Sequence, residues 1–187
     1  MANNDIYTGL LDRKVLAVAG EVNGDMLKYF RNSMAELYCK GCPDIMIIFS
    51  SNGGEVITGL DIYDLIVTYP GKKTGIVTGL AASIAAVILQ ACDKRFATHH
   101  ARVLIHHINT RRVGLDTLRD DSKIAELRKD LEQSQAHLYE ILCKKTNKTR
   151  EVISEECVKN REMMAAEAVQ FGLLDGEWDK PLPFTGS

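Results

Sequence analysis

The chain has 187 residues and a formal net charge of −2, with 45% hydrophobic and 26% charged residues. This composition is typical of a globular protein and excludes a disordered one, and the length suits one domain spanning residues 1–187. The near-neutral charge argues against nucleic acid or a membrane surface as the main partner.

Signals for export, membrane insertion and cofactor binding are missing from the sequence. It has no secretory leader and no run of the roughly 20 apolar residues that a membrane span needs. The five cysteines are an odd number, so we expect reduced thiols and a cytoplasmic location. Cys39 and Cys42 have CxxC spacing, but no partner pair stands at zinc-site spacing, and no phosphate-binding GxxxxGKS/T loop is present. We therefore expect neither a metal nor another cofactor, ATP included.

In chain order, apolar runs alternate with segments of helical periodicity. The expected strands are residues 15–19, 45–49, 74–78, 95–98 and 102–105. The expected helices between them are residues 25–38, 56–67 and 81–92. The 45–49 strand is apolar throughout, which is typical of a sheet covered on both faces. This alternation predicts an α/β fold with a largely parallel sheet.

A charged segment from Asp116 to Lys145 has apolar residues three, four or seven positions apart, which predicts a helix roughly 45 Å long. Such a helix is longer than the core of this domain needs, so we expect it to project and to pack against another subunit. A helical hairpin with a hidden break is the alternative. Two short helices at 150–159 and 165–171 and a tail at 181–187 complete the chain.

Reactive side chains stand at the ends of several expected elements. Gly53-Gly54 follow a buried strand, where glycines allow a close approach of backbone N–H groups to a ligand. Ser83 stands between a strand and a helix, where free N–H groups suit an oxyanion, although an ordinary capping serine fits the same position. His106-His107 end a strand and are candidate general bases, and His99-His100 are a similar pair. Spacing alone does not choose among these histidines.

Taken in order, these segments resemble the Clp protease family, the ClpP proteolytic subunits of the caseinolytic ATP-dependent proteases. The resemblance runs from Asp5 to about Asp175. Ser51-Asn-Gly-Gly resembles the family's SPGG segment, and Gly79-Leu-Ala-Ala-Ser83 resembles its GxAAS nucleophile motif. The remaining similar segments are the family's opening strand region at 5–15, its histidine strand at 94–106 and its closing EAxxxGLxD motif at 167–175.

The resemblance implies the ClpP/crotonase-like fold, with repeated strand–strand–helix units and a projecting handle helix at about 115–146. It also implies self-association into heptameric rings that stack in pairs as a tetradecamer. A polypeptide substrate and an AAA+ unfoldase are the implied partners. The segment before Asp5 is shorter than the family's axial hairpin. We therefore expect weaker docking to an unfoldase than in family members that carry this hairpin.

Carried over position by position, the resemblance makes Ser83 the nucleophile and His106 the general base. The backbone N–H groups of Gly54 and Ile84 would form the oxyanion hole. Asn160 stands where the family has its catalytic Asp. An Asn side chain can orient a histidine, but it cannot stabilise an imidazolium by charge. The implied function is a serine endopeptidase that cleaves unfolded polypeptides or short peptides inside an oligomeric chamber, with activity reduced by Asn160.

Three alternatives remain beside this interpretation. In the first alternative, the chain is a ClpP-like structural subunit that needs an active partner, because Asn160 has weakened its triad. In a second alternative it is a Ser–Lys peptidase relative, with Lys94 or Lys123 as the base. The broader crotonase fold binds acyl-CoA, but its members usually work without a serine nucleophile. The GxAAS motif and the Ile105-His106 pair favour the serine peptidase.

Overall fold

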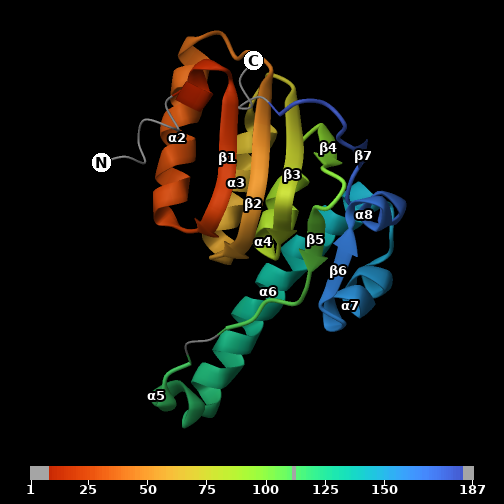
Figure 1. Ribbon diagram of the computed structural model, residues 1–187. Helices are drawn as coiled ribbons and strands as arrows, with labels where there is room; N and C mark the ends of the chain where they lie inside the picture. Colours follow the sequence, from red (N-terminus) through yellow and green to blue (C-terminus); the bar gives the residue numbers. More distant parts are fainter. Residues whose placement is uncertain (1–8, 111–112, 183–187) are drawn as a thin grey trace.

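A mostly parallel sheet forms the centre of the molecule (Figure 1). The computed structural model describes residues 9–110 and 113–182. Within these residues the sheet has seven strands: β1 (Val15–Val22), β2 (Ile45–Gly54), β3 (Lys73–Ala82), β4 (Lys94–Ala97), β5 (Arg102–Ile105), β6 (Arg161–Met164) and β7 (Gly176–Glu177). Parallel pairs join β1 to β2, β2 to β3, β3 to both β4 and β5, and β4 to β7. The predicted α/β fold with a largely parallel sheet is confirmed.

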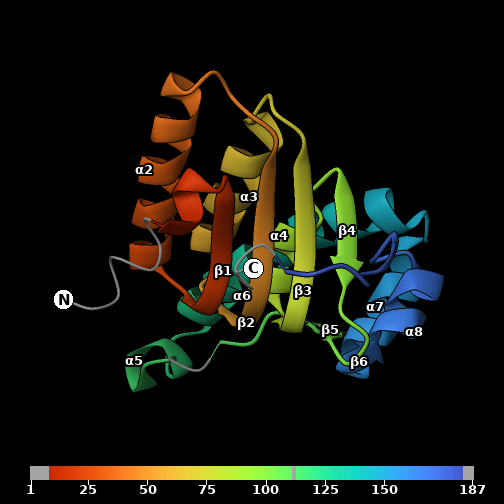
Figure 2. The same ribbon diagram turned by 45° about the horizontal axis from the view of Figure 1, so that its top comes forward.

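Both faces of the sheet carry buried apolar side chains, as the apolar strand at 45–49 predicts. The helices α2 (Gly24–Cys39), α3 (Val56–Thr68) and α4 (Ile84–Leu89) lie on one face (Figure 2). Along β2, Ile47 and Phe49 enter the larger core cluster with these helices. Ile48 instead joins a smaller cluster that includes Trp178. Successive side chains of one strand therefore pack into two different apolar layers, because they point to opposite faces of the sheet.

The third strand is longer than its expected range of 74–78, and it changes where the next helix begins. β3 continues to Ala82, and its last residues pair with β5. The expected helix at 81–92 is therefore wrong at its start, since α4 begins at Ile84. Small residues at 79–82 fit a helix by composition, but pairing with neighbouring strands decides their conformation.

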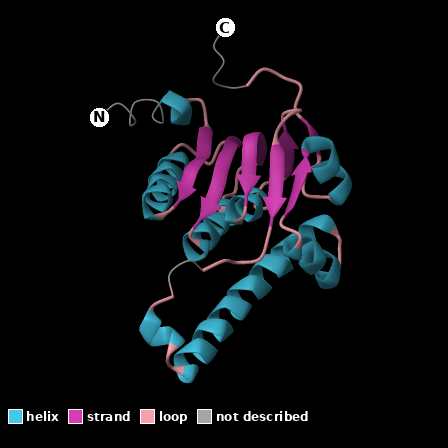
Figure 3. Cartoon of the chain, turned by 60° about the horizontal axis from the view of Figure 1, so that its bottom comes forward, coloured by secondary structure: helices cyan, strands magenta, loops and turns pink. Residues whose placement is uncertain are grey.

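A 26-residue helix, α6 (Asp121–Thr146), extends away from the sheet (Figures 1 and 3). At 1.5 Å per residue it is about 39 Å long. Its buried residues are all near its C-terminal end: Leu138, Tyr139, Leu142 and Thr146. The remainder of the helix projects from the domain, as expected.

The projecting helix begins later than the predicted 115–146, because the chain breaks before it. A short helix, α5 (Leu115–Leu118), comes first and lies at the far end of α6 (Figure 1). The Asp120 carboxylate then accepts hydrogen bonds from the N–H groups of Ser122 and Lys123 at 3.0 and 3.3 Å. This N-cap fixes the start of α6 at Asp121.

The C-terminal part adds α7 (Arg150–Val158) and α8 (Ala165–Phe171), close to their expected ranges. Strand β6 lies between them and pairs antiparallel with β5. This strand was not predicted from the sequence. Residues 5–8 of the family's opening segment and residues 183–187 of the expected tail lie outside the described residues.

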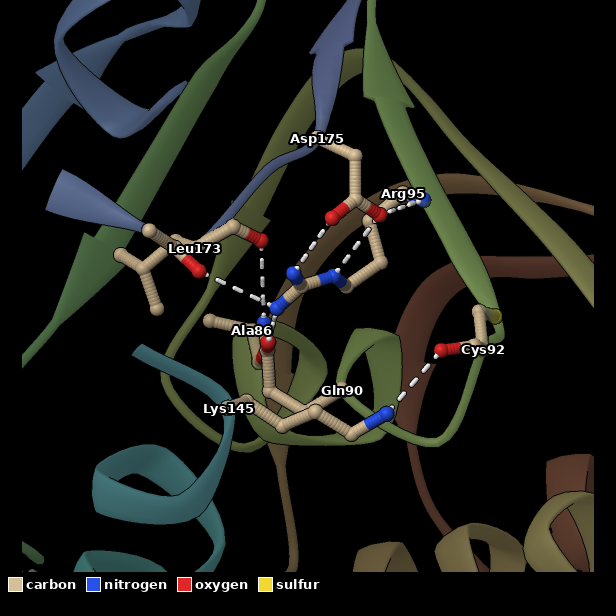
Figure 4. A network of polar contacts seen from close by, with 8 residues as sticks. Ala86, Gln90, Cys92, Arg95, Lys145, Leu173 and Asp175 are labelled. Carbon is tan, nitrogen blue, oxygen red and sulfur yellow. Dashed lines mark hydrogen bonds and ion pairs between the residues drawn. The ribbon is translucent and has the colours of Figure 1, made fainter. Parts of the chain in front are cut away.

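Buried Arg95 ties the C-terminal segment to the end of α4 (Figure 4). Its guanidinium donates to both carboxylate oxygens of Asp175, at 2.7 and 3.2 Å. It also donates to the Gln90 Oε1 atom at 2.5 Å and to the Gly172 carbonyl at 3.1 Å. Gln90 in turn donates to the Ala86 carbonyl inside α4, at 2.9 Å. The network holds the C-terminal end of a six-residue helix whose other end adjoins Ser83.

Candidate active site

Ser83 occupies a strained turn between β3 and α4. Its backbone has φ 58° and ψ −130°, a region that costs a non-glycine residue about 1–3 kcal/mol. The turn is held on both sides: the Ser83 N–H donates to the Leu104 carbonyl at 2.9 Å, and its own carbonyl accepts from the Ala86 N–H at 3.0 Å. A sharp strand–turn–helix of this kind presents a side chain at the top of a sheet, as a nucleophile requires.

Gly53 lets the end of β2 approach Ser83 closely. A Cβ atom at this position would lie 2.8 Å from the Ser83 Cβ atom and 2.7 Å from the Ala82 carbonyl oxygen. Its φ of 91° also disfavours any other residue. The Gly53 N–H is already used, because it donates to the Ser51 hydroxyl at 3.0 Å. Gly53 is therefore a residue of close approach and does not supply a free donor.

The two expected oxyanion donors, the N–H groups of Gly54 and Ile84, directly follow Gly53 and Ser83 in the chain. Ile84 is the first residue of α4, so its N–H has no preceding helical turn in which to find a carbonyl. Gly54 directly follows Gly53 and lies against the Val22 backbone, where a Cβ atom would clash. The Val22 carbonyl accepts its hydrogen bond from the Glu55 N–H at 2.9 Å. The Gly54 N–H is therefore not the donor in that contact.

Ser83 and His106 line one narrow pocket. His106 directly follows β5, which is hydrogen-bonded to the end of the strand that carries Ser83. The apolar lining residues are Val56, Val87, Ile105, Ile108, Leu138 and Leu142, and Gln135 is a further polar one. The cavity volume is about 10 Å³, which is room for about one water molecule. Among the described residues no hydrogen bond joins Ser83 to His106, so the pair shares a pocket in a separated arrangement.

The orientation of the His106 ring is set by its own backbone neighbour. Its Nδ1 atom lies 2.5 Å from the main-chain oxygen of His107. A carbonyl oxygen only accepts, so Nδ1 carries a proton, and in the neutral ring Nε2 is then the unprotonated nitrogen. This tautomer is the one that a general base requires. The Asn109 side-chain amide also lies 3.4 Å from Nδ1.

The comparison with protein families decides the identity of the fold. The family model described as Clp protease matches residues 1–179. The chain belongs to the Clp protease family. It is 34% identical over 143 residues to "ATP-dependent Clp protease proteolytic subunit 1" of Chlamydia muridarum, a match that covers 75% of this chain and 72% of that relative. It is 31% identical over 175 residues to "ATP-dependent Clp protease proteolytic subunit" of Ligilactobacillus salivarius, covering 92% of this chain and 86% of that relative.

The other histidines of this Clp protease chain have different partners. The His107 Nε2 atom lies 2.6 Å from the Tyr139 hydroxyl, which itself donates to the Ser154 hydroxyl at 3.1 Å. His107 thus connects the end of β5 to α6 and α7. His99 is exposed and pairs with Glu177 at 2.9 Å. Of His99, His106 and His107, His106 is the one that lines the pocket of Ser83.

Asn160 lies at the same end of β5 as His106, but it does not contact the ring. The antiparallel ladder ends at the pair Ile105 and Arg161, and His106 and Asn160 are the residues that adjoin this pair. Asn160 has a φ of 50°, is exposed, and donates its N–H to the Cys157 carbonyl at 3.1 Å. Among the described residues its side chain makes no hydrogen bond. Asn160, the third expected site residue, therefore adjoins the same end of the β5–β6 pair as His106, but its side chain has no hydrogen-bond partner among the described residues.

The lysines of the Ser–Lys alternative lie elsewhere. Lys94 is exposed at the start of β4, and Lys123 is exposed in the projecting first turn of α6, 4.0 Å from Asp120. Neither lines the pocket that holds Ser83.

The described part of the chain contains no group of three or more His, Cys, Asp or Glu side chains arranged to hold a metal ion. Cys39 and Cys42, at the end of α2, are free thiols. Within the same described residues, no helix is long and apolar enough to span a membrane.

Proposed function

We propose that this Clp protease chain is a serine endopeptidase subunit that cleaves unfolded polypeptides or short peptides with Ser83 as nucleophile and His106 as base. The observation that carries the proposal is their common pocket: a strained turn presents Ser83, and His106 lines the same cavity in the tautomer of a base. The similarity to proteolytic subunits of other Clp proteases supports the same chemistry.

In the proposed reaction, the His106 Nε2 atom takes the proton of the Ser83 hydroxyl as the serine oxygen attacks the peptide carbonyl carbon. The resulting oxyanion accepts hydrogen bonds from the N–H groups of Ile84 and Gly54, each worth about 3 kcal/mol in the transition state. The C–N bond then breaks, and His106 gives its proton to the departing amine. Water, activated by the same histidine, hydrolyses the acyl-enzyme and restores Ser83.

Activity in this scheme is reduced by the third residue. When His106 turns toward Ser83, its Nδ1–H leaves the His107 carbonyl and needs another acceptor. Asn160 adjoins the Arg161 that pairs with Ile105, and its amide oxygen is the acceptor that we propose. An amide oxygen orients the ring but does not stabilise the imidazolium with a full charge, so we expect slower turnover than an Asp would give.

Assembly and partners follow from the same family membership. We propose that the chains form heptameric rings stacked as a tetradecamer, in which the projecting α6 packs against another subunit. Leu115 and Leu118, beside its outer end, each have 58% of their surface exposed. Such apolar side chains are suited to burial in a contact between subunits. An AAA+ unfoldase would supply any dependence on ATP.

A structural subunit with little activity of its own is the second candidate function. The unengaged Asn160 side chain and the missing Ser83–His106 hydrogen bond within the described residues favour it. In that case the chain would need a more active partner in a mixed ring.

Hydrolysis of a fluorogenic peptide by the purified protein tests the proposal. We expect measurable turnover that falls by at least about 100-fold in Ser83→Ala. Ser33→Ala, in α2 and away from the pocket, is the matched control and should keep wild-type turnover. Equal turnover in wild type and Ser83→Ala would exclude Ser83 as the nucleophile. Absence of turnover in a correctly assembled wild type would favour the structural subunit.

A further inference from the structure

Gln135, on the projecting helix, reaches the pocket of Ser83 and His106 with one end of its amide engaged. Its Oε1 atom accepts a hydrogen bond from the Ile108 N–H at 2.8 Å. Because a backbone N–H can only donate, the amide cannot be turned the other way without losing this bond. The position of the Nε2 atom is therefore determined by the segment that follows β5.

The other end of the amide is buried without a partner. The Gln135 Nε2 atom is shielded from solvent, and no hydrogen-bond acceptor reaches it among residues 9–110 and 113–182. Side-chain donors in protein interiors are normally paired, so an unpaired one is available to an ordered water or to a ligand that enters the pocket. Six of the residues that line the same pocket are apolar, and Gln135 is its polar lining residue besides Ser83 and His106.

The side chain that enters this pocket is determined by the position of the nucleophile. Ser83 attacks a carbonyl carbon of the substrate. The Cα atom bonded to this carbon bears the side chain of the residue before the cleaved bond, so that side chain is the one nearest to the pocket lining. A charged group there would lose its hydration without a counter-charge, because the walls contributed by residues such as Val87 and Leu142 are apolar. An uncharged side chain with an acceptor oxygen fits both the apolar walls and the free N–H.

We propose that Gln135 is a specificity-determining residue, whose Nε2–H donates to the side-chain oxygen of a glutamine immediately before the cleaved bond. This inference rests on the proposed peptidase function. The α6 wall and the segment after His106 must separate to admit that side chain, since the cavity is now close to 10 Å³. A methionine of nearly the same shape enters with equal ease, but it leaves the donor with at most a weak acceptor.

Binding of product-like peptides tests the inference without requiring catalysis. Two peptides that differ only in a C-terminal Gln or Met compete with a fluorescent peptide for the Ser83→Ala protein. In Gln135→Leu we expect the dissociation constant of the Gln peptide to rise by about ten-fold relative to that of the Met peptide. Gln133→Leu, at an exposed position two residues earlier on α6, is the control and should keep the starting ratio.

A second variant separates the donor from the acceptor. Gln135→Glu keeps an oxygen for the Ile108 N–H but lacks the amide donor, and at about pH 8 its carboxylate is ionised. We expect it to lose the preference for Gln as Gln135→Leu does. An unchanged ratio in either variant would overturn the inference, and so would failure of both peptides to bind. If the wild-type protein has no peptidase activity, a lost preference in Gln135→Leu would still show that Gln135 selects the bound side chain, but the proposed function would be rejected.

Discussion

The His106 ring donates from Nδ1 to the main-chain oxygen of His107 at 2.5 Å, although Asn160 adjoins the Arg161 that pairs with Ile105. A backbone carbonyl therefore orients the candidate base in this arrangement. That contact leaves Nε2 free to accept a proton, and within the described residues no hydrogen bond joins the ring to Ser83. A stronger acceptor at position 160 would compete with the carbonyl for Nδ1–H.

Asn160→Asp is accordingly expected to raise peptide hydrolysis, by at least about ten-fold, because a carboxylate both draws Nδ1–H and stabilises the imidazolium. The measurement is turnover of a fluorogenic peptide at constant assembly state. Asn147→Asp, at the exposed end of α6, makes the same chemical change away from the pocket and should leave turnover unaltered. No gain in Asn160→Asp, with assembly intact, would contradict this account of the weak third residue.

The two adjacent histidines are expected to differ sharply in their contribution. His106→Ala removes the proposed base, so turnover should fall by at least about 100-fold. His107→Ala removes the contact with the Tyr139 hydroxyl, and it should mainly lower stability by about 1 kcal/mol. Turnover and urea unfolding of both variants separate these effects. Loss of turnover only in His107→Ala would reverse the assignment.

Gly53→Ala should lower activity by disturbing the local geometry around Ser83. The added Cβ atom would stand 2.8 Å from the Ser83 Cβ atom, and the φ of 91° is unfavourable for alanine. Either the end of β2 or the serine turn must shift, so we expect a loss of more than about ten-fold in turnover. The control is Gly114→Ala, where a Cβ atom would meet open space. Wild-type turnover in Gly53→Ala would show that the close approach is dispensable.

The Arg95–Asp175 pair should make stability depend on acid pH. Burial raises the pKa of the Asp175 carboxyl, but hydrogen bonds from Arg95 and its charge outweigh that effect, so the pKa lies below its ordinary value of 3.8. A lowered folded-state pKa adds stability above pH 3.8, which is lost as the pH falls through the folded-state value. Urea unfolding should show this acid loss in wild type and a smaller one in Asp175→Asn. Equal acid profiles for the two proteins would contradict it.

Arg95→Met should destabilise the protein at neutral pH, by about 3 kcal/mol, because it leaves the Asp175 carboxylate and Gln90 without their main partner. Since this network holds the end of α4, turnover should fall as well. Arg102→Met, which breaks an exposed pair with Glu162, is the control and should cost less than about 1 kcal/mol. A similar loss in both variants would argue against a special role for the buried network.

Periodicity was enough to predict the fold class and most elements. The strand at 45–49 was recognisable as an uninterrupted apolar run, and the helix at 56–67 was recognisable because burial of one face imposes a repeat of about four residues. The start of the helix after Ser83 was mispredicted, because residues 79–82 are held by strand pairing that lies far away in sequence. Asp120, by contrast, is a local N-cap signal that would have placed the start of α6 correctly.

The site was only partly predictable. Family resemblance predicted Ser83 and His106, which the fold brings to one pocket, while the partners of the His106 and His107 rings could not be read from the sequence. The β5–β6 register, whose last pair His106 and Asn160 adjoin, is also invisible in the sequence. Gln135 was missed altogether. Its role depends on an unpaired atom in a pocket, and a helix pattern carries no signal for that.

The most direct test of the central claim is the site at which a fluorophosphonate probe attaches. The probe forms a covalent bond only with an activated serine, and mass spectrometry of the digested protein locates the adduct. The account predicts one adduct on the peptide that contains Ser83, absent in Ser83→Ala and strongly slowed in His106→Ala. An adduct on another serine, or no adduct in a folded and assembled protein, would contradict it.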